Sequence, residues 1–121
     1  MSNASQTYKS VARQTSSPRE LEATLLLQAA ARLQSVHDTW DENRTQLDDA
    51  LRFNRKLWSV FLSEITDSRH PMPKALRQNV ANLGLFVMNH TLAVISSPRP
   101  EKLNSLISIN REIAAGLLSH A

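Results

Sequence analysis

Histidine and acidic side chains come first in this sequence, because they bind metals and transfer protons in enzymes. His37 and Asp41 lie four residues apart and would share one helix face, but two ligands do not complete a metal site. The other three histidines are scattered, and none belongs to an H-E-x-x-H arrangement. Asp48 and Asp49 are adjacent, so on a helix their carboxylates diverge and cannot act as a catalytic pair. These residues predict neither a metal site nor acid–base catalysis.

Other kinds of catalytic site are disfavoured by composition. The sequence has no cysteine, which removes thiolate nucleophiles, disulfides and thiolate zinc sites together. With two glycines the chain cannot build a Gly-rich phosphate loop, and no serine occupies a nucleophile elbow. We therefore predict that the protein is not an enzyme and that it uses no cofactor.

A basic cluster is formed by Arg52, Arg55 and Lys56, beside the aromatic residues Phe53 and Trp58. A nucleic-acid interface needs a basic stripe with stacking rings. Here the rings fall on or near an apolar helix face, and two aspartates lie one turn away. The formal net charge of +3 is too small to imply nucleic-acid binding by itself. Contact with RNA or DNA is therefore disfavoured.

The elements that position these residues are predicted to be helices. Leu, Ala, Gln, Arg and Glu are abundant, while aromatic residues make up only 5% of the chain. No Pro or Gly lies between Pro18 and Pro71. One helix over most of that span would be about 75 Å long, whereas a compact domain of this size has a diameter of about 35 Å. The chain must therefore fold back, and we place the break at 40–44, with Asn43 as a possible cap.

Four main helices follow from this pattern. The first begins at Pro18, where Ser17 can act as the N-cap and Glu20 completes a capping box. The second ends before the double proline of 70–73 and carries a 4-3-4-3-4 row typical of helix-on-helix packing: Leu47, Leu51, Asn54, Trp58, Phe61 and Ile65. The last two are predicted over about 73–95 and 100–118.

The helix over 73–95 is predicted to be the most buried, because it carries apolar side chains on two faces. Gly84 in its middle costs about 0.5–1 kcal/mol relative to Ala, which predicts the close approach of a neighbouring element. Residues 78–98 carry no formal charge and are numerous enough to span a bilayer, but asparagines, a histidine and a threonine interrupt them. A buried helix is therefore favoured over membrane insertion.

The domain organisation follows from the same pattern. Residues 17–121 are predicted to form one helical bundle, large enough to bury a core. Residues 1–16 are polar and predict a flexible arm or a short helix. The start of the chain has no signal-peptide pattern, so we predict a cytoplasmic protein.

Asn54 and Asn110 are each expected within an apolar helix face. A polar side chain in such a place is costly unless it is hydrogen-bonded, and helical bundles use it to fix register or a partner. Hydrogen bonding inside the bundle is the favoured interpretation, and direct contact with a partner is the alternative.

Five local signatures occur in order along the chain. They are Tyr8 in the polar arm, S-P-R-E-x-E-A at 17–23, A-L-x-F-N-x-K-L-W at 50–58, Met72-Pro73, and L-I-x-I-N-R-x-I-A-x-G-L at 106–117. Together they resemble the FlaF family of flagellar biosynthesis regulators of alphaproteobacteria, over nearly the whole chain. The segments around Asn54 and Asn110 are the specific parts, and Met72 stands where leucine is expected.

The resemblance implies a small cytosolic, non-enzymatic factor required for flagellin production or export. It implies action on flagellin itself, opposite FlbT, a translational regulator of flagellin. The first hypothesis is therefore a chaperone-like factor that binds flagellin. The alternative is a post-transcriptional regulator that acts on flagellin mRNA, alone or with FlbT, through a basic face made of Arg52, Arg55, Lys56 and Arg111.

The candidate partner-binding residues are those that carry the resemblance: Tyr8, Arg19, Glu22, Asn54, Trp58 and Asn110. For Trp58 a place in the core is favoured, and Arg19 and Glu22, three apart on one helix, could pair with each other. The wide apolar surface of the helix that begins at Pro18 is the predicted groove for flagellin. We expect the arm with Tyr8 and Val11 to pack weakly over it and to be displaced on binding.

Overall fold

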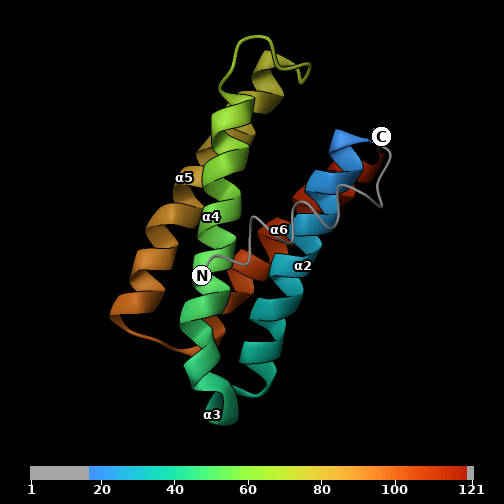
Figure 1. Cartoon of the computed structure of the whole chain (residues 1–121). Coiled ribbons are helices and arrows are strands. Elements are labelled where there is room, and N and C mark those ends of the chain that lie inside the picture. Colours follow the sequence, from blue (N-terminus) through green and yellow to red (C-terminus); the bar gives the residue numbers. More distant parts are fainter. Residues whose placement is uncertain (1–16, 120–121) are drawn as a thin grey trace.

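The computed structural model describes residues 17–119, which form helices and connecting loops without a strand. The long helices are α2 (Pro18–Asp38), α4 (Leu47–Ile65), α5 (Lys74–Ser96) and α6 (Leu103–Ser119). They run alternately in opposite directions along one bundle (Figure 1). The predicted all-α bundle with four main helices is confirmed, while the arm or short helix predicted for 1–16 lies outside the described residues.

The start of α2 follows the sequence signal. Ser17 is the N-cap in an extended conformation, and its hydroxyl oxygen accepts a hydrogen bond from the Glu20 backbone N–H at 3.1 Å. The Ser17 hydroxyl also donates to the Glu20 carboxylate at 3.1 Å. Pro18 occupies the first turn, where no backbone donor is needed. The predicted cap is therefore confirmed.

The chain folds back between α2 and α4, close to the predicted position. Thr39 ends α2, and the short helices α3 (Trp40–Asn43) and η1 (Arg44–Gln46) make the turn. Asn43 caps no long helix: its side chain donates to the Thr39 hydroxyl at 2.6 Å, and α4 begins after Gln46 without a side-chain cap. The place of the break was predictable, but its cap was not.

The core lies among α2, α4 and α6, and α5 packs mainly against α4 at one side of the bundle (Figure 1). The prediction that residues 73–95 form the most buried helix is therefore wrong. A single row of α5 is buried, made of Val80, Gly84, Val87, Thr91 and Val94. The more deeply embedded helix is α2, whose apolar residues pack on both α4 and α6. None of the described helices has the length and hydropathy needed to cross a bilayer.

Gly84 marks a close approach of α5 to α4, as predicted. A Cβ atom at this position would lie 2.8 Å from Cγ and 2.9 Å from Cδ1 of Leu62, and closer still to Cδ2. Real carbon atoms do not approach so closely, so a larger residue would displace Leu62 or separate the two helices. A Cβ at Gly116 on α6 would meet nothing within 4 Å.

This contrast predicts opposite effects for two alanine substitutions. Gly84→Ala is expected to lower the free energy of unfolding by about 1–2 kcal/mol, because overpacking against Leu62 outweighs the better helix propensity. Gly116→Ala is expected to raise it by about 0.5 kcal/mol through helix propensity alone. Urea unfolding followed by circular dichroism measures both. Equal stabilisation by the two substitutions would show that the approach at Gly84 is not tight.

Candidate functional site

Three of the residues singled out from the sequence form one buried cluster, here called the amide cluster: Asn54, Trp58 and Asn110. The Trp58 indole N–H donates to the Asn110 side-chain oxygen at 2.9 Å. The Asn110 amide donates to the Asn54 side-chain oxygen at 2.7 Å and to the Leu26 carbonyl at 3.2 Å. These bonds join α2, α4 and α6 at one level of the bundle.

The amide cluster has a structural role in this fold. All three side chains are fully buried. Asn110 uses its oxygen and both of its amide hydrogens, whereas the Asn54 amide nitrogen has no hydrogen-bond partner. The hydrogen bonds favour the interpretation that the asparagines fix the helices in register. Direct contact of these residues with a partner would require the bundle to open.

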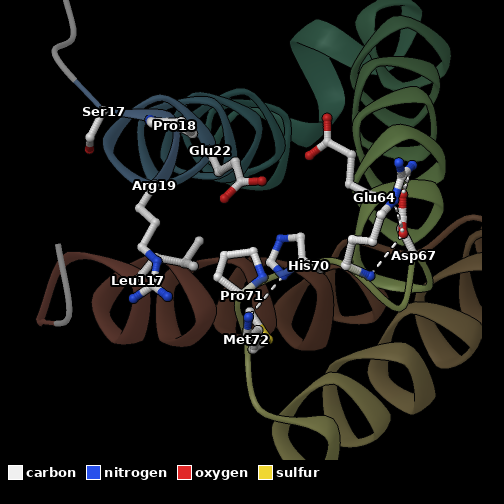
Figure 2. Close-up of a pocket in the computed structure, with 11 residues that line it drawn as sticks. Ser17, Pro18, Arg19, Glu22, Glu64, Asp67, His70, Pro71, Met72 and Leu117 are labelled. Atoms are coloured by element: carbon white, nitrogen blue, oxygen red, sulfur yellow. Dashed lines mark hydrogen bonds and ion pairs between the residues drawn. The ribbon is translucent and has the colours of Figure 1, made fainter.

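A pocket of about 770 Å³ lies at one end of the bundle, where the start of α2, the end of α4, the 66–73 loop and the end of α6 meet (Figure 2). We call it the end pocket. Its wall is mostly apolar, with Pro18, Met72 and Leu117 among its residues. Charged residues from α2, α4 and the loop line it as well: Arg19, Glu22, Glu64, Asp67 and Arg69.

Glu22 and Glu64 form the unusual electrostatic feature of the end pocket. The pKa of Glu22 is raised from 4.5 to about 8, first by burial and then by a hydrogen bond and charge repulsion from Glu64. The positive charge of Arg19 acts in the opposite direction and lowers the Glu22 pKa. At neutral pH, Glu22 therefore holds a proton in the folded protein.

A pH-dependent stability follows from this shift. Between pH 4.5 and about 8, Glu22 is ionised in the unfolded chain but protonated in the folded one. Folding takes up a proton in that range, so the Glu22 contribution to stability falls as the pH rises through it. Glu22→Gln removes this loss. We expect it to raise the free energy of unfolding by about 1 kcal/mol at pH 8, a value reduced for solvent screening, and to leave it unchanged below pH 4.5.

Urea unfolding at pH 4, 6 and 8 measures the effect of Glu22→Gln. Glu112→Gln, an exposed substitution of the same kind on α6, is the control. Parallel pH profiles for the wild type and Glu22→Gln would contradict the raised pKa.

The exposed apolar surface of the bundle is concentrated on α5. Leu85 is 59% exposed, Leu92 57% and Ile95 49%, and Phe86 is 44% exposed. We call the exposed side of α5 its outer face; Leu85 and Leu92 lie near its middle, and Phe86 and Ile95 lie at its two opposite edges. Phe86 stacks on His90, whose ring nitrogen is 2.7 Å from the Lys102 carbonyl oxygen. Exposed apolar residues gathered on one element mark an interaction site more often than scattered ones do.

The described residues were also compared with the requirements of a metal site. Within 17–119, no group of three or more histidine, cysteine or acidic side chains could hold a metal ion. Besides its carboxylates and guanidinium groups, the end pocket is lined by the hydroxyl of the capping Ser17 and by the imidazole of His70.

The family model for the flagellar protein FlaF matches residues 4–117. The chain belongs to the FlaF family. No match was found among curated proteins or solved structures. Family membership implies a flagellar role for this chain, and FlaF is a regulatory family without a known enzymatic activity.

The residues that carry the FlaF resemblance separate into two places. Asn54, Trp58 and Asn110 lie in the amide cluster, whereas Arg19 and Glu22 line the end pocket. Met72 and Leu117, from two further signature segments, line the same pocket. Tyr8 lies outside the described residues. The structure thus brings together segments that are distant in sequence, and partner contact by Arg19 and Glu22 stays a prediction.

The four residues of the basic face expected for an mRNA-binding FlaF protein lie on two helices, α4 and α6. Arg52 pairs with Asp49 on its own helix at 3.2 Å, and the Arg111 guanidinium donates to Gln34 on α2 at 3.3 Å. Arg55 and Lys56 are exposed on α4. RNA contact through these residues stays a prediction.

Two features of the site were missed from the sequence. The apolar surface was expected on α2, but most apolar side chains of α2 are buried, and the most exposed leucines lie on α5. The Arg77 side chain was not singled out, although its guanidinium donates to the carbonyls of Met72 at 3.0 Å, Asp67 at 3.2 Å and Ile65 at 3.3 Å. Nothing local in the sequence indicates a contact between a helix start and the preceding loop.

Proposed function

We propose that this FlaF-family chain binds flagellin in the cytoplasm and supports its production or export as a chaperone-like factor. The observation that carries the proposal is the outer face of α5, where four large apolar side chains stay exposed on one helix. Flagellin ends in amphipathic helices, and such a helix is recognised by laying its apolar stripe against an apolar helical surface. The family membership supplies the flagellar context.

The rigidity of the bundle also suits a protein that binds a partner. The amide cluster holds three helices in one register, so the platform that carries α5 is preorganised. A rigid platform loses little conformational entropy when a partner helix docks. A FlbT-type regulator is the second partner that we propose, because the FlaF resemblance implies that the two factors act on flagellin in opposite ways.

Isothermal titration calorimetry with full-length flagellin tests the proposal. We expect saturable heat with a dissociation constant in the micromolar range, about −8 kcal/mol in binding free energy. The absence of heat at tens of micromolar of both proteins would refute flagellin binding. A gel shift with flagellin mRNA is the parallel measurement, and RNA affinity that falls steeply with salt would favour the regulatory alternative.

A further inference from the structure

We propose that two copies of this chain pair antiparallel through the outward side of α5 and thereby cover its exposed leucines. The side chains concerned form what we call the outer row: Asn82, Leu85, Asn89, Leu92 and Ser96. All five are exposed. This proposal does not rest on flagellin binding, because it concerns the protein alone.

The spacing of the outer row fits another helix. Its members are 3, 4, 3 and 4 residues apart, which is the repeat by which helices pack along a shared seam. The buried row of α5, from Val80 to Val94, has the matching 4-3-4-3 spacing on the opposite side of the helix and packs against α4. One helix thus carries two such rows, and among residues 17–119 only the buried row packs against a neighbouring helix.

The order of side chains in the outer row is self-complementary. In an antiparallel pair centred on Asn89, each Leu85 faces the Leu92 of the other copy, and each Asn82 faces a Ser96. The two Asn89 amides meet on the two-fold axis, where each can donate to and accept from its equivalent. A two-fold interface requires this kind of self-matching, and a central asparagine is a known device for fixing the register of paired helices.

Charge also permits the approach of a second copy. Identical surfaces carry identical charges, so self-association normally brings like charges together. From Gln78 to Ser96, α5 has no charged residue. The two cations near its start are Lys74 and Arg77, and Arg77 is engaged with the carbonyls of the 66–73 loop. An antiparallel pair centred on Asn89 leaves these cations at opposite ends of the interface.

The size of the surface sets the expected strength. Leu85 and Leu92 are the two large apolar side chains of the outer row in each copy, whereas stable dimers bury about 1,200 Å² or more. We therefore expect a weak dimer, with a dissociation constant of about 10–100 µM. Such a dimer hides the apolar face when no partner is bound and releases it on dilution or on partner binding.

Sedimentation equilibrium from 5 to 500 µM gives the first test, and the wild type should pass from monomer to dimer in this range. The double variant Leu85→Glu with Leu92→Glu should stay monomeric. Leu27→Glu with Val60→Glu is the matched control, because those side chains are each 41% exposed on α2 and α4, and it should dimerise like the wild type. A wild type that is monomeric at 500 µM would overturn the proposal.

Because the chain has no cysteine, disulfide crosslinking reports the geometry cleanly. With oxidised glutathione, Asn89→Cys should form a covalent dimer, since position 89 lies on the axis. Asn82→Cys and Val60→Cys should not, since Asn82 faces Ser96 and Val60 lies on another helix. Equal crosslinking at positions 82 and 89 would overturn the antiparallel register. If the wild type is monomeric and the Leu85→Glu/Leu92→Glu variant no longer binds flagellin, the outer row is a flagellin site alone. This result would also overturn the dimer.

Discussion

Asn110→Ala is expected to lower the free energy of unfolding by about 3–4 kcal/mol, because it leaves two buried polar groups unpaired and opens a small cavity. The unpaired groups are the Trp58 indole N–H and the Asn54 side-chain oxygen, which bond to Asn110 at 2.9 and 2.7 Å. Both lie in a fully buried environment. A loss of this size shifts the unfolding midpoint by many degrees in a domain of this length.

Asn54→Ala is the matched control, since it removes the same atoms from the same cluster. It deprives Asn110 of one acceptor, but the Asn110 amide still donates to Leu26, and the unpartnered amide nitrogen of Asn54 is removed as well. We expect a loss of about 1 kcal/mol. Urea unfolding measures both variants, and equal losses would show that cavity formation, not hydrogen bonding, sets the cost.

The same pair of variants separates stability from recognition. Asn54→Ala should leave flagellin binding unchanged at temperatures where it is fully folded, because Asn54 is not accessible. Weaker binding by a folded Asn54→Ala protein would instead support the alternative that this asparagine acts on a partner.

The helices and the start of α2 were predictable because their signals are local. Ser17 and Glu20 lie within one turn of each other, and the double proline of 70–73 cannot continue a helix whatever surrounds it. The close contact at Gly84 was also predictable. A glycine within a helix lowers helix stability, and the close approach of a neighbouring element is a reason for it to occur there. These inferences need no knowledge of how the helices are arranged.

The burial of α5 was not predictable, because periodicity shows which faces of a helix are apolar and not how many neighbours it has. Leu85 and Leu92 repeat with the same spacing as Val80 and Val87. A central helix and a helix at the side of the bundle with one unoccupied seam therefore have the same pattern. The arrangement in space decides between them, and here α5 lies at the side.

The end pocket shows a second limit of local reasoning. Arg19 and Glu22 suggested an ion pair one turn apart, and Arg19 does lower the pKa of Glu22. The larger effects on that carboxyl come from burial and from Glu64, which stands at the far end of another helix. Only the fold-back after α2 brings Glu64 to Glu22, and no sequence spacing encodes that contact.

Arg77→Ala is expected to destabilise the protein by about 2–3 kcal/mol, because one guanidinium donates hydrogen bonds to three backbone carbonyls at the end of α4 and in the following loop. Arg77 is partly buried, so water replaces these bonds only in part. It also places a positive charge at the C-terminal end of α4, where the helix dipole favours it. Arg77→Lys should recover less than half of the loss, since an ammonium group cannot reproduce the fork of donors.

Arg77 hydrogen-bonds to the loop that forms one wall of the end pocket, so Arg77→Ala should make this loop less ordered. We expect faster amide hydrogen exchange at 66–72 in Arg77→Ala while exchange in α2 and α6 is little changed. Arg69→Ala is the control, because its ion pair with Asp67 is exposed and should contribute little to stability. Similar exchange in both variants would mean that the loop keeps its shape without the guanidinium, and that prolines 71 and 73 alone determine this end of the bundle.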